Sequence, residues 1–272
     1  RQMCIRDRFS TNQNEGYRFK DSSGTELFRW GVNGEKDARN KIRILAKAGV
    51  DLIKLIDQDQ MTFEELSAIV DEAHKHNLKV VAHAHRPEEI RLGLKVGVDN
   101  FEHTGLSSSP KFPDDVIEMI NERTAQMNLG PLFWTPTIEG LYNYTDVINN
   151  NEHLDNDSWH LDLPDSIILD IKNSIAKPGE LPYFQLTPIR KPTLKTKFDQ
   201  LRNSGVVMMI GTDSGIPMKF HSQSTWNELE VWVNVFDVEP ASTSLNLVEI
   251  LPLSSFKADI LEVIAVSLSL TE

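Results

Sequence analysis

The sequence is short of cysteine, glycine and proline, and it has no long hydrophobic run. Its single cysteine, Cys4, excludes a scaffold held together by disulfide bonds. The 14 glycines and 13 prolines among 272 residues are too few for a collagen-like or disordered chain. No apolar stretch approaches the roughly 18 to 20 residues that a membrane helix requires. The composition is therefore that of a globular chain able to bury a sizeable core, and it indicates no membrane partner.

Basic residues are also scarce in comparison with acidic ones. The chain has 28 Lys and Arg against 40 Asp and Glu, which gives a formal net charge of −12 at pH 7. Binding to nucleic acid needs an excess of Lys and Arg on some face of the protein, and no cluster of them stands out. We therefore expect no nucleic-acid partner. The composition leaves open whether the chain forms a homo-oligomer.

The two ends of the chain differ from its middle. Residues 1–8 (RQMCIRDR) lack the apolar region and the cleavage site of a signal peptide, and they resemble a translated sequencing-adaptor read-through. We interpret residues 1–30 as a non-native or irregular segment, residues 31–240 as the main domain and residues 241–272 as an unassigned tail. The natural N-terminus is then expected to be missing, so the sequence gives no prediction of localisation.

From about residue 31, short apolar runs alternate with segments of helical periodicity. Helices are expected at residues 35–48, 62–76, 87–96, 114–125, 194–204 and 225–237, and strands at 51–56, 79–84, 100–103, 132–137 and 206–210. This alternation is typical of strand–helix units around a buried parallel sheet. The irregular stretch 141–192 interrupts it. We interpret that insertion as a candidate substrate cover, with a surface excursion of no function as the alternative.

Several residues with metal-binding or acid–base chemistry lie within the expected strands or near their carboxyl ends. They are Lys54, His83, His85, His103 and Asp213. In a barrel of parallel strands these ends share one face, where active sites are built. A charged lysine inside an apolar strand is costly unless it is paired or chemically altered. Because imidazole and carboxylate groups are ligands that zinc prefers, the pattern predicts a metal site.

Four separated motifs carry a resemblance to a known family. They are residues 49–55 (GVDLIKL), 80–85 (VVAHAH), 97–105 (GVDNFEHTG) and 210–215 (IGTDSG). Together they resemble the metal-dependent amidohydrolase superfamily, most closely its imidazolonepropionase-like and prolidase-like branch, over about residues 31–240. Residues 72–79 (EAHKHNLK) and 226–230 (WNELE) are similar to that branch as well. The resemblance implies a partial TIM (β/α)8 barrel with about five of the eight parallel strand–helix units, and it puts the insertion after the seventh strand.

The resemblance also implies a role for individual residues. Lys54 would be the strand-four lysine, whose carbamate bridges two metal ions, and His83 and His103 would be the ligands from strands five and six. Asp213 would bind metal after strand eight and shuttle the proton. The implied reaction is hydrolysis of a C–N bond in a small peptide-like or cyclic amide by a metal-activated hydroxide. Zn²⁺ is the expected metal, with one or two ions in the full-length parent.

Two further histidines are candidate substrate-binding residues. His85 follows His83 by two residues, so a strand would place both side chains on one face. His221 lies in the loop that follows Asp213, on the same expected rim. For His85 the alternative is a simple loop histidine.

The start of the sequence departs from the family pattern. No histidine precedes His74, so the first-strand His-x-His pair of the family is absent, and strands one to three have no convincing counterparts. We therefore expect the C-terminal part of an enzyme, with an incomplete first metal site and an open strand edge at residues 51–56. Two other functions stay open. One is a lactonase or phosphotriesterase-like hydrolase on the same metal site, and the other is a metal-free, non-catalytic barrel.

Overall fold

The computed structural model describes residues 2–6, 17–20, 26–56, 58–104, 107–149, 163–177, 180, 182–214, 219 and 223–239. The candidate residue His221 lies outside them. The chain divides into two compact units. The first consists of Arg1–Pro136 and Pro188–Val207, and the second of Thr137–Thr187 and Met208–Glu272.

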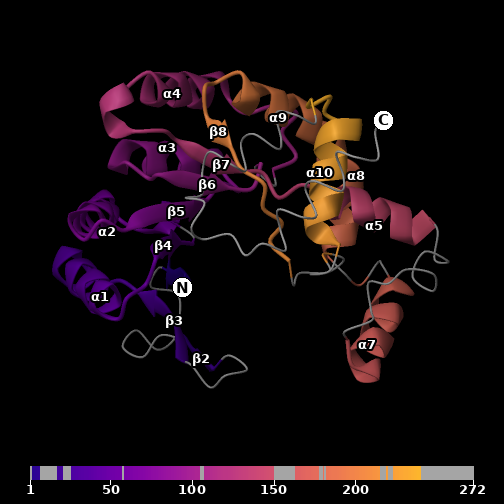
Figure 1. Ribbon diagram of the computed structural model, residues 1–272, viewed down its shortest axis with the longest axis horizontal. Coiled ribbons are helices and arrows are strands. Elements are labelled where there is room, and N and C mark those ends of the chain that lie inside the picture. Colours follow the sequence, from indigo (N-terminus) through magenta and orange to yellow (C-terminus); the bar gives the residue numbers. More distant parts are fainter. Residues whose placement is uncertain are drawn as a thin grey trace, which may run out of the picture. The chain divides into compact units, whose positions relative to one another are not determined.

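The first unit is built on one sheet, whose strands lie in the order β2-β3-β1-β4-β5-β6-β7-β8. The strands are β1 (Gln2–Arg6), β2 (Tyr17–Lys20), β3 (Glu26–Gly31), β4 (Leu52–Leu55), β5 (Lys79–His83), β6 (Asn100–Glu102), β7 (Phe133–Thr135) and β8 (Val207–Met208). Strands β4 to β7 run parallel to one another, and β1 runs parallel to both β3 and β4. Strand β2 is antiparallel to β3. The open sheet confirms the expected α/β class and is consistent with a partial barrel (Figure 1).

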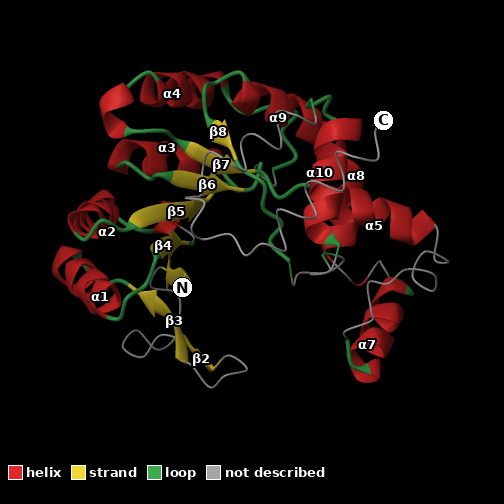
Figure 2. Cartoon of the chain, viewed as in Figure 1, coloured by secondary structure: helices red, strands yellow, loops and turns green. Residues whose placement is uncertain are grey.

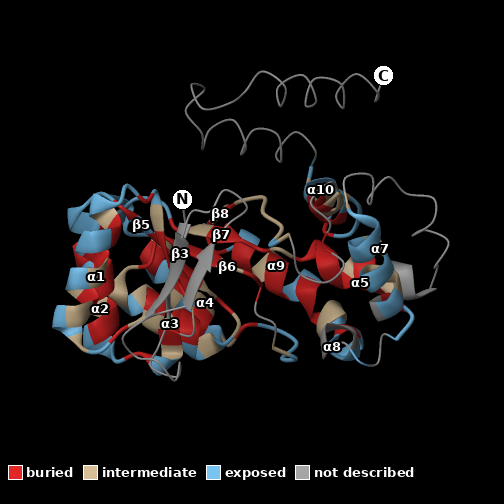
Figure 3. Ribbon diagram, turned by 90° about the horizontal axis from the view of Figure 1, so that it is seen from below, coloured by how far each residue is buried: buried red, intermediate tan, exposed pale blue. Residues whose placement is uncertain are grey.

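Helices follow the strands of this unit along one face of the sheet (Figure 2). They are α1 (Glu35–Lys47), α2 (Phe63–Lys75), α3 (Pro87–Val96), α4 (Asp114–Thr124) and α9 (Leu194–Arg202), with short 3₁₀ turns η1 (Gln58–Gln60), η2 (Met127–Leu129) and η5 (Lys191–Thr193). Figure 3 shows α1 and α2 with buried residues on the side of the strands and exposed residues on the opposite side. This is the amphipathic pattern from which these helices were predicted.

Local signals explain where these helices begin and end. The Thr62 hydroxyl accepts a hydrogen bond from the Glu65 backbone N–H at 3.2 Å, and the Glu65 carboxylate accepts one from the Thr62 N–H at 3.0 Å. These two bonds form a capping box at the start of α2. Helix α3 begins with Pro87 and ends at Gly97, whose φ of 88° is a left-handed conformation that glycine adopts without strain.

The core of the first unit lies between the strands and these helices. Phe101 on β6 and Trp134 on β7 are fully buried, with ring centroids 5.1 Å apart. Phe112 packs edge-on against Trp134 at 5.8 Å. A Cβ atom at Gly93 on α3 would come within 2.6 Å of the Phe101 ring. Glycine at this position therefore lets α3 approach β6 closely, which fixes the strand that leads to His103.

The N-terminal segment contributes strands that the sequence pattern did not indicate. Strand β1 pairs with β4, placing Cys4 opposite Lys54 and Ile5 opposite Leu55. The expected open edge at residues 51–56 is therefore wrong, because β1 takes up the backbone hydrogen-bonding groups of β4 on that side. The non-native origin of residues 1–30 stays a prediction.

The second unit contains helices within the stretch predicted to be irregular. They are α5 (Glu139–Asn149), α7 (Asp165–Ile175) and the first part of α8 (Pro182–Arg190), and this unit also holds α10 (Ser224–Asn234). On α5, Leu141 and Tyr144 are buried at a spacing of three residues. Helix α5 packs against α10, and the Tyr142 and Phe236 rings meet edge-on at 6.0 Å. A role of the insertion as a substrate cover stays a prediction.

Strand β8 is shorter than the apolar run 206–210, from which it was predicted. It is the last strand in the sheet order, so a neighbour holds it on one side only. Among the helices of the described ranges, none combines the length and the apolar character needed to cross a membrane.

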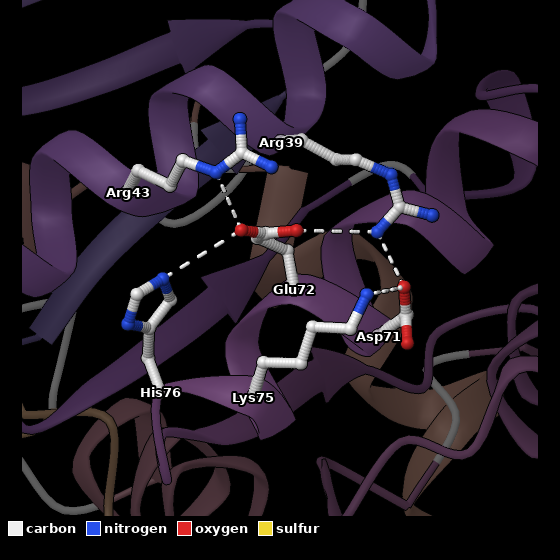
Figure 4. A network of polar contacts seen from close by, with 6 residues as sticks. All are labelled: Arg39, Arg43, Asp71, Glu72, Lys75 and His76. Atoms are coloured by element: carbon white, nitrogen blue, oxygen red, sulfur yellow. Dashed lines mark hydrogen bonds and ion pairs between the residues drawn. The ribbon is translucent and has the colours of Figure 1, made fainter.

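Helices α1 and α2 are also joined by a polar network (Figure 4). Its centre is Glu72, a buried carboxylate that accepts hydrogen bonds from Arg43 at 2.6 Å and from Arg39 at 3.3 Å. Arg39 also pairs with Asp71, which accepts a second bond from Lys75 at 2.7 Å. The hydrogen bond from Arg43 is the main cause that holds the pKa of Glu72 below its ordinary value. The network fixes the packing of the first two helices of the unit.

Candidate metal centre

Three histidines gather where β5 and β6 end. The potential ligand atoms of His83, His85 and His103 all lie within 4.8 Å of one another. The three rings are stacked pairwise, with centroids 4.6 to 4.8 Å apart. Nε2 of His103 lies 2.7 Å from Nδ1 of His83. His103 is buried and the other two are partly buried, so the cluster is a compact imidazole donor set.

The first two histidines of this cluster are fastened through their backbones. The buried side-chain amide of Gln58, on the turn after β4, donates a hydrogen bond to the His83 carbonyl. The His85 backbone N–H donates to the Glu89 carboxylate at 2.8 Å. Neither partner was predicted from the sequence. Gln58 carries no local signal, whereas Glu89 stands at the third position of a helix that begins with proline, where a capping carboxylate is expected.

Burial dominates the electrostatics of Glu89. Burial raises the pKa of this carboxyl, and the hydrogen bonds from Arg86 oppose the rise. Arg86 donates to Glu89 at 2.9 Å and to Asp59 at 2.7 Å, which connects the start of α3 to the turn after β4. The loop that carries His85 is therefore held by a charged pair rather than left to move freely.

His103 is held in an unusual backbone conformation. Its φ is 75°, a left-handed value that a residue with a side chain adopts at a cost of about 1–3 kcal/mol. Its N–H donates to the Thr135 carbonyl at 2.8 Å, and its carbonyl accepts from the Trp134 indole N–H at 2.6 Å. Both partners lie on β7. The neighbouring strand thus maintains the conformation that brings the His103 ring to His83.

Lys54 lies on β4, and its side chain is almost completely buried. Its ammonium forms an ion pair with Glu102 on β6, across the intervening β5. Glu102 was not among the residues singled out from the sequence. The signal that drew attention to Lys54 was also available for Glu102, because both are charged residues inside an expected strand. The two opposite charges pair with each other.

Asp213 is the one other candidate among the described residues. Asp213 belongs to the second unit, is exposed and has a φ of 56°, again a left-handed value. The hydroxyls of its neighbours Thr212 and Ser214 form a hydrogen bond at 2.6 Å. His74 stands outside the cluster and pairs with Asp99 at 2.7 Å. The structure thus brings His83, His85 and His103 together.

The donor set of the first unit fits a transition-metal ion. Three imidazoles are a recurring ligand set of catalytic zinc sites, in which a fourth position stays open for water or substrate. The backbone contacts of the three histidines supply the outer support that orients such ligands. An ammonium group has no lone pair to offer, so Lys54 in its ion pair with Glu102 is not a metal ligand in this state.

Comparisons with known proteins give one family. The profile of the Amidohydrolase family matches residues 9–255. No curated protein matches the chain. Among solved structures, the chain is similar to a protein assigned as a prolidase from Bifidobacterium longum, with 23% identity, a TM-score of 0.53, and coverage of 83% of this chain and 50% of the other.

Two further structures agree with this fold. A. niger ochratoxinase is 19% identical at a TM-score of 0.52, over 80% of this chain and 42% of the other. A Xaa-Pro dipeptidase with methionine bound in its active site is 20% identical at a TM-score of 0.50, over 79% and 46%. The chain spans about half the length of these solved structures.

Proposed function

The chain belongs to the amidohydrolase family, and on that premise we propose that it cleaves a C–N amide bond in a small peptide-like or cyclic amide with the help of a divalent metal ion. The observation that supports the metal is the cluster of His83, His85 and His103, whose ligand atoms lie within 4.8 Å of one another. Zn²⁺ is the proposed ion, because imidazole donors suit it well. One or two ions are proposed for the whole protein.

In this proposal the three histidines hold the ion, and His85 is added to the ligands expected from the sequence. It lies as close to His83 and His103 as they lie to each other. A bound ion of this kind polarises a carbonyl and lowers the pKa of a bound water to about 7. Lys54 is proposed to add oxygen ligands as a carbamate. Because a carbamate is an anion, Glu102 must then release its present contact with Lys54.

Asp213 is proposed as the proton shuttle. Its exposed carboxylate can accept the proton of the attacking water and pass it to the leaving nitrogen, and acid–base help of this kind contributes about 10²- to 10⁴-fold to the rate. His221 is proposed to contact the substrate. Dipeptides are the first substrates to test, since two of the similar structures are described as a prolidase and as a Xaa-Pro dipeptidase.

A substrate panel tests this proposal. The chain is incubated with Zn²⁺ and a set of Xaa-Pro dipeptides, a cyclic amide, a lactone and a phosphotriester, beside His103→Ala as the matched inactive control. Hydrolysis of an amide that disappears in the control supports the proposal. Hydrolysis of only the lactone or the phosphotriester would replace it by the alternative hydrolase, and zinc binding without any hydrolysis would leave a binding protein.

A further inference from the structure

The second unit contains a buried lysine that joins two loops. Lys219 is only 5% exposed, and its ammonium donates hydrogen bonds to the Thr137 carbonyl at 2.8 Å and to the Thr212 carbonyl at 2.7 Å. Thr137 follows the end of β7, and Thr212 directly precedes Asp213. One positive charge therefore connects the chain after β7 to the chain after β8.

Both connected loops contain a residue in a strained backbone conformation. Thr137 has a φ of 51° and Asp213 a φ of 56°, values that cost a residue with a side chain about 1–2 kcal/mol. Such conformations persist where the surrounding structure determines them, and they are concentrated at functional sites. The carbonyl of Thr137 itself and the carbonyl just before Asp213 are the two acceptors of Lys219.

A buried glutamate holds the first loop from its other side. The Glu228 carboxylate accepts hydrogen bonds from the backbone N–H groups of Ile138 and Glu139, both at 2.8 Å, at the start of α5. Its second oxygen accepts from the Trp232 indole at 3.0 Å. Burial raises the pKa of Glu228, while the charge of Lys219 and these N–H donors oppose the rise.

The cluster contains a second buried carboxyl group, that of Glu139. Glu139 is completely buried, and burial raises its pKa to about 8 against the opposing charge of Lys219. It is therefore largely uncharged at pH 7. The ammonium of Lys219 is held by its hydrogen bonds to the Thr137 and Thr212 carbonyls, which satisfy a buried donor.

We propose that Lys219 is a positioning residue for Asp213. The Thr212 carbonyl and the Asp213 N–H belong to one planar peptide unit, so fixing the carbonyl restricts the direction in which the Asp213 side chain leaves the backbone. Through its second hydrogen bond, Lys219 fixes this peptide unit relative to the loop after β7. Glu228 in turn holds that loop in place. The inference rests on the proposed function, in which Asp213 moves the proton.

Substitution of Lys219 tests the proposal in the hydrolysis assay. Lys219→Met keeps the aliphatic stem and removes both hydrogen bonds, so kcat should fall about 10- to 100-fold with KM within about twofold. Lys219→Arg keeps the charge and donors and should restore part of kcat. The matched control is Lys197→Met. Lys197 is also buried and donates to the Ser107 carbonyl at 2.8 Å in the first unit, and its loss should leave kcat per folded molecule unchanged.

Backbone hydrogen exchange gives a readout that needs no activity. In Lys219→Met, exchange should accelerate in residues 137–139 and 211–214 together, with no change in β5 and β6. If the variant unfolds, Lys219→Gln, which keeps an amide donor, serves in its place. Unchanged exchange in either loop overturns the proposal, and so does faster exchange with an unchanged kcat. If the unsubstituted chain hydrolyses nothing, the proposed function fails, while exchange still decides whether Lys219 joins the loops.

Discussion

Nε2 of His103 and Nδ1 of His83 lie 2.7 Å apart, at the ends of two neighbouring parallel strands. In this contact one ring nitrogen donates a proton and the other accepts it, so at least one ring must be neutral. A metal ion would take the place of that proton, because metal ligation uses the same lone pairs. The two ring nitrogens are therefore placed so that both could bind one metal ion.

The close approach of α3 to β6 predicts that Gly93→Ala destabilises the protein. The added Cβ would meet the Phe101 ring at 2.6 Å, and overpacking of a core costs about 1–3 kcal/mol. This should exceed the gain of about 1 kcal/mol that alanine brings to a helix interior. Denaturant unfolding measures the difference. The pair Gly93→Ala, Phe101→Leu should recover part of the loss, and an unchanged midpoint in the single variant would contradict the packing described.

The network around Glu72 predicts sensitivity to acid. The pKa of Glu72 is held below its ordinary 4.5, chiefly by the hydrogen bond from Arg43. Its contribution is thus complete above pH 4.5 and is lost as the pH falls through the lower pKa of the folded state. Glu72→Gln should lower the free energy of unfolding by about 1 kcal/mol at pH 7, and by less near pH 3.

A matched control separates this effect from a general change of charge. Glu118 lies exposed on α4, so Glu118→Gln should change the free energy of unfolding by less than about 0.5 kcal/mol at either pH. Equal losses in the two variants, or a loss at Glu72 that grows toward low pH, would show that the network does not work as described.

Glu139 should give the opposite pH dependence. Its pKa is about 8 in the folded protein, raised by burial, and 4.5 ordinarily. Between these values the unfolded chain has released a proton that the folded protein retains, so stability falls as the pH rises from 4.5 to 8. The side chain of Glu139→Gln does not titrate. The free energy of unfolding of this variant should therefore rise relative to that of the unsubstituted protein, by on the order of 1–2 kcal/mol between pH 6 and pH 8.

Urea unfolding of both proteins at several pH values measures this difference. The charges that face Glu139 are those of Lys219 and Glu228, and both remain in the variant. Parallel stability curves for the two proteins across this range would show that Glu139 is not protonated in the folded state.

Much of the first unit could be predicted from the sequence because its signals are local. Thr62 and Glu65 mark the start of α2 within four residues, and Pro87 and Gly97 mark both ends of α3. Apolar runs located β4 to β8, and the histidines followed from the rule that parallel strands end on one face. His85 was expected beside His83 from strand alternation, but as a substrate contact and not as a metal ligand.

The missed features depend on partners that are distant in the sequence. Strand β1 has no apolar alternation of its own and is placed by pairing with β4. Glu102 and Lys54 are 48 residues apart, so the sequence around either residue does not indicate that the two form an ion pair. Lys219 carries no signal in the sequence, and its proposed positioning role rests on the two carbonyls that the fold brings to it.

Zinc titration of the metal-free chain by isothermal calorimetry tests the central claim most directly. The account predicts binding of Zn²⁺ by the first unit, with affinity lowered by at least about 100-fold in each of His83→Ala, His85→Ala and His103→Ala. His74→Ala should bind as the unsubstituted chain does, since His74 is occupied with Asp99. Absence of zinc binding, or equal affinity in the three cluster variants and the control, would contradict the account.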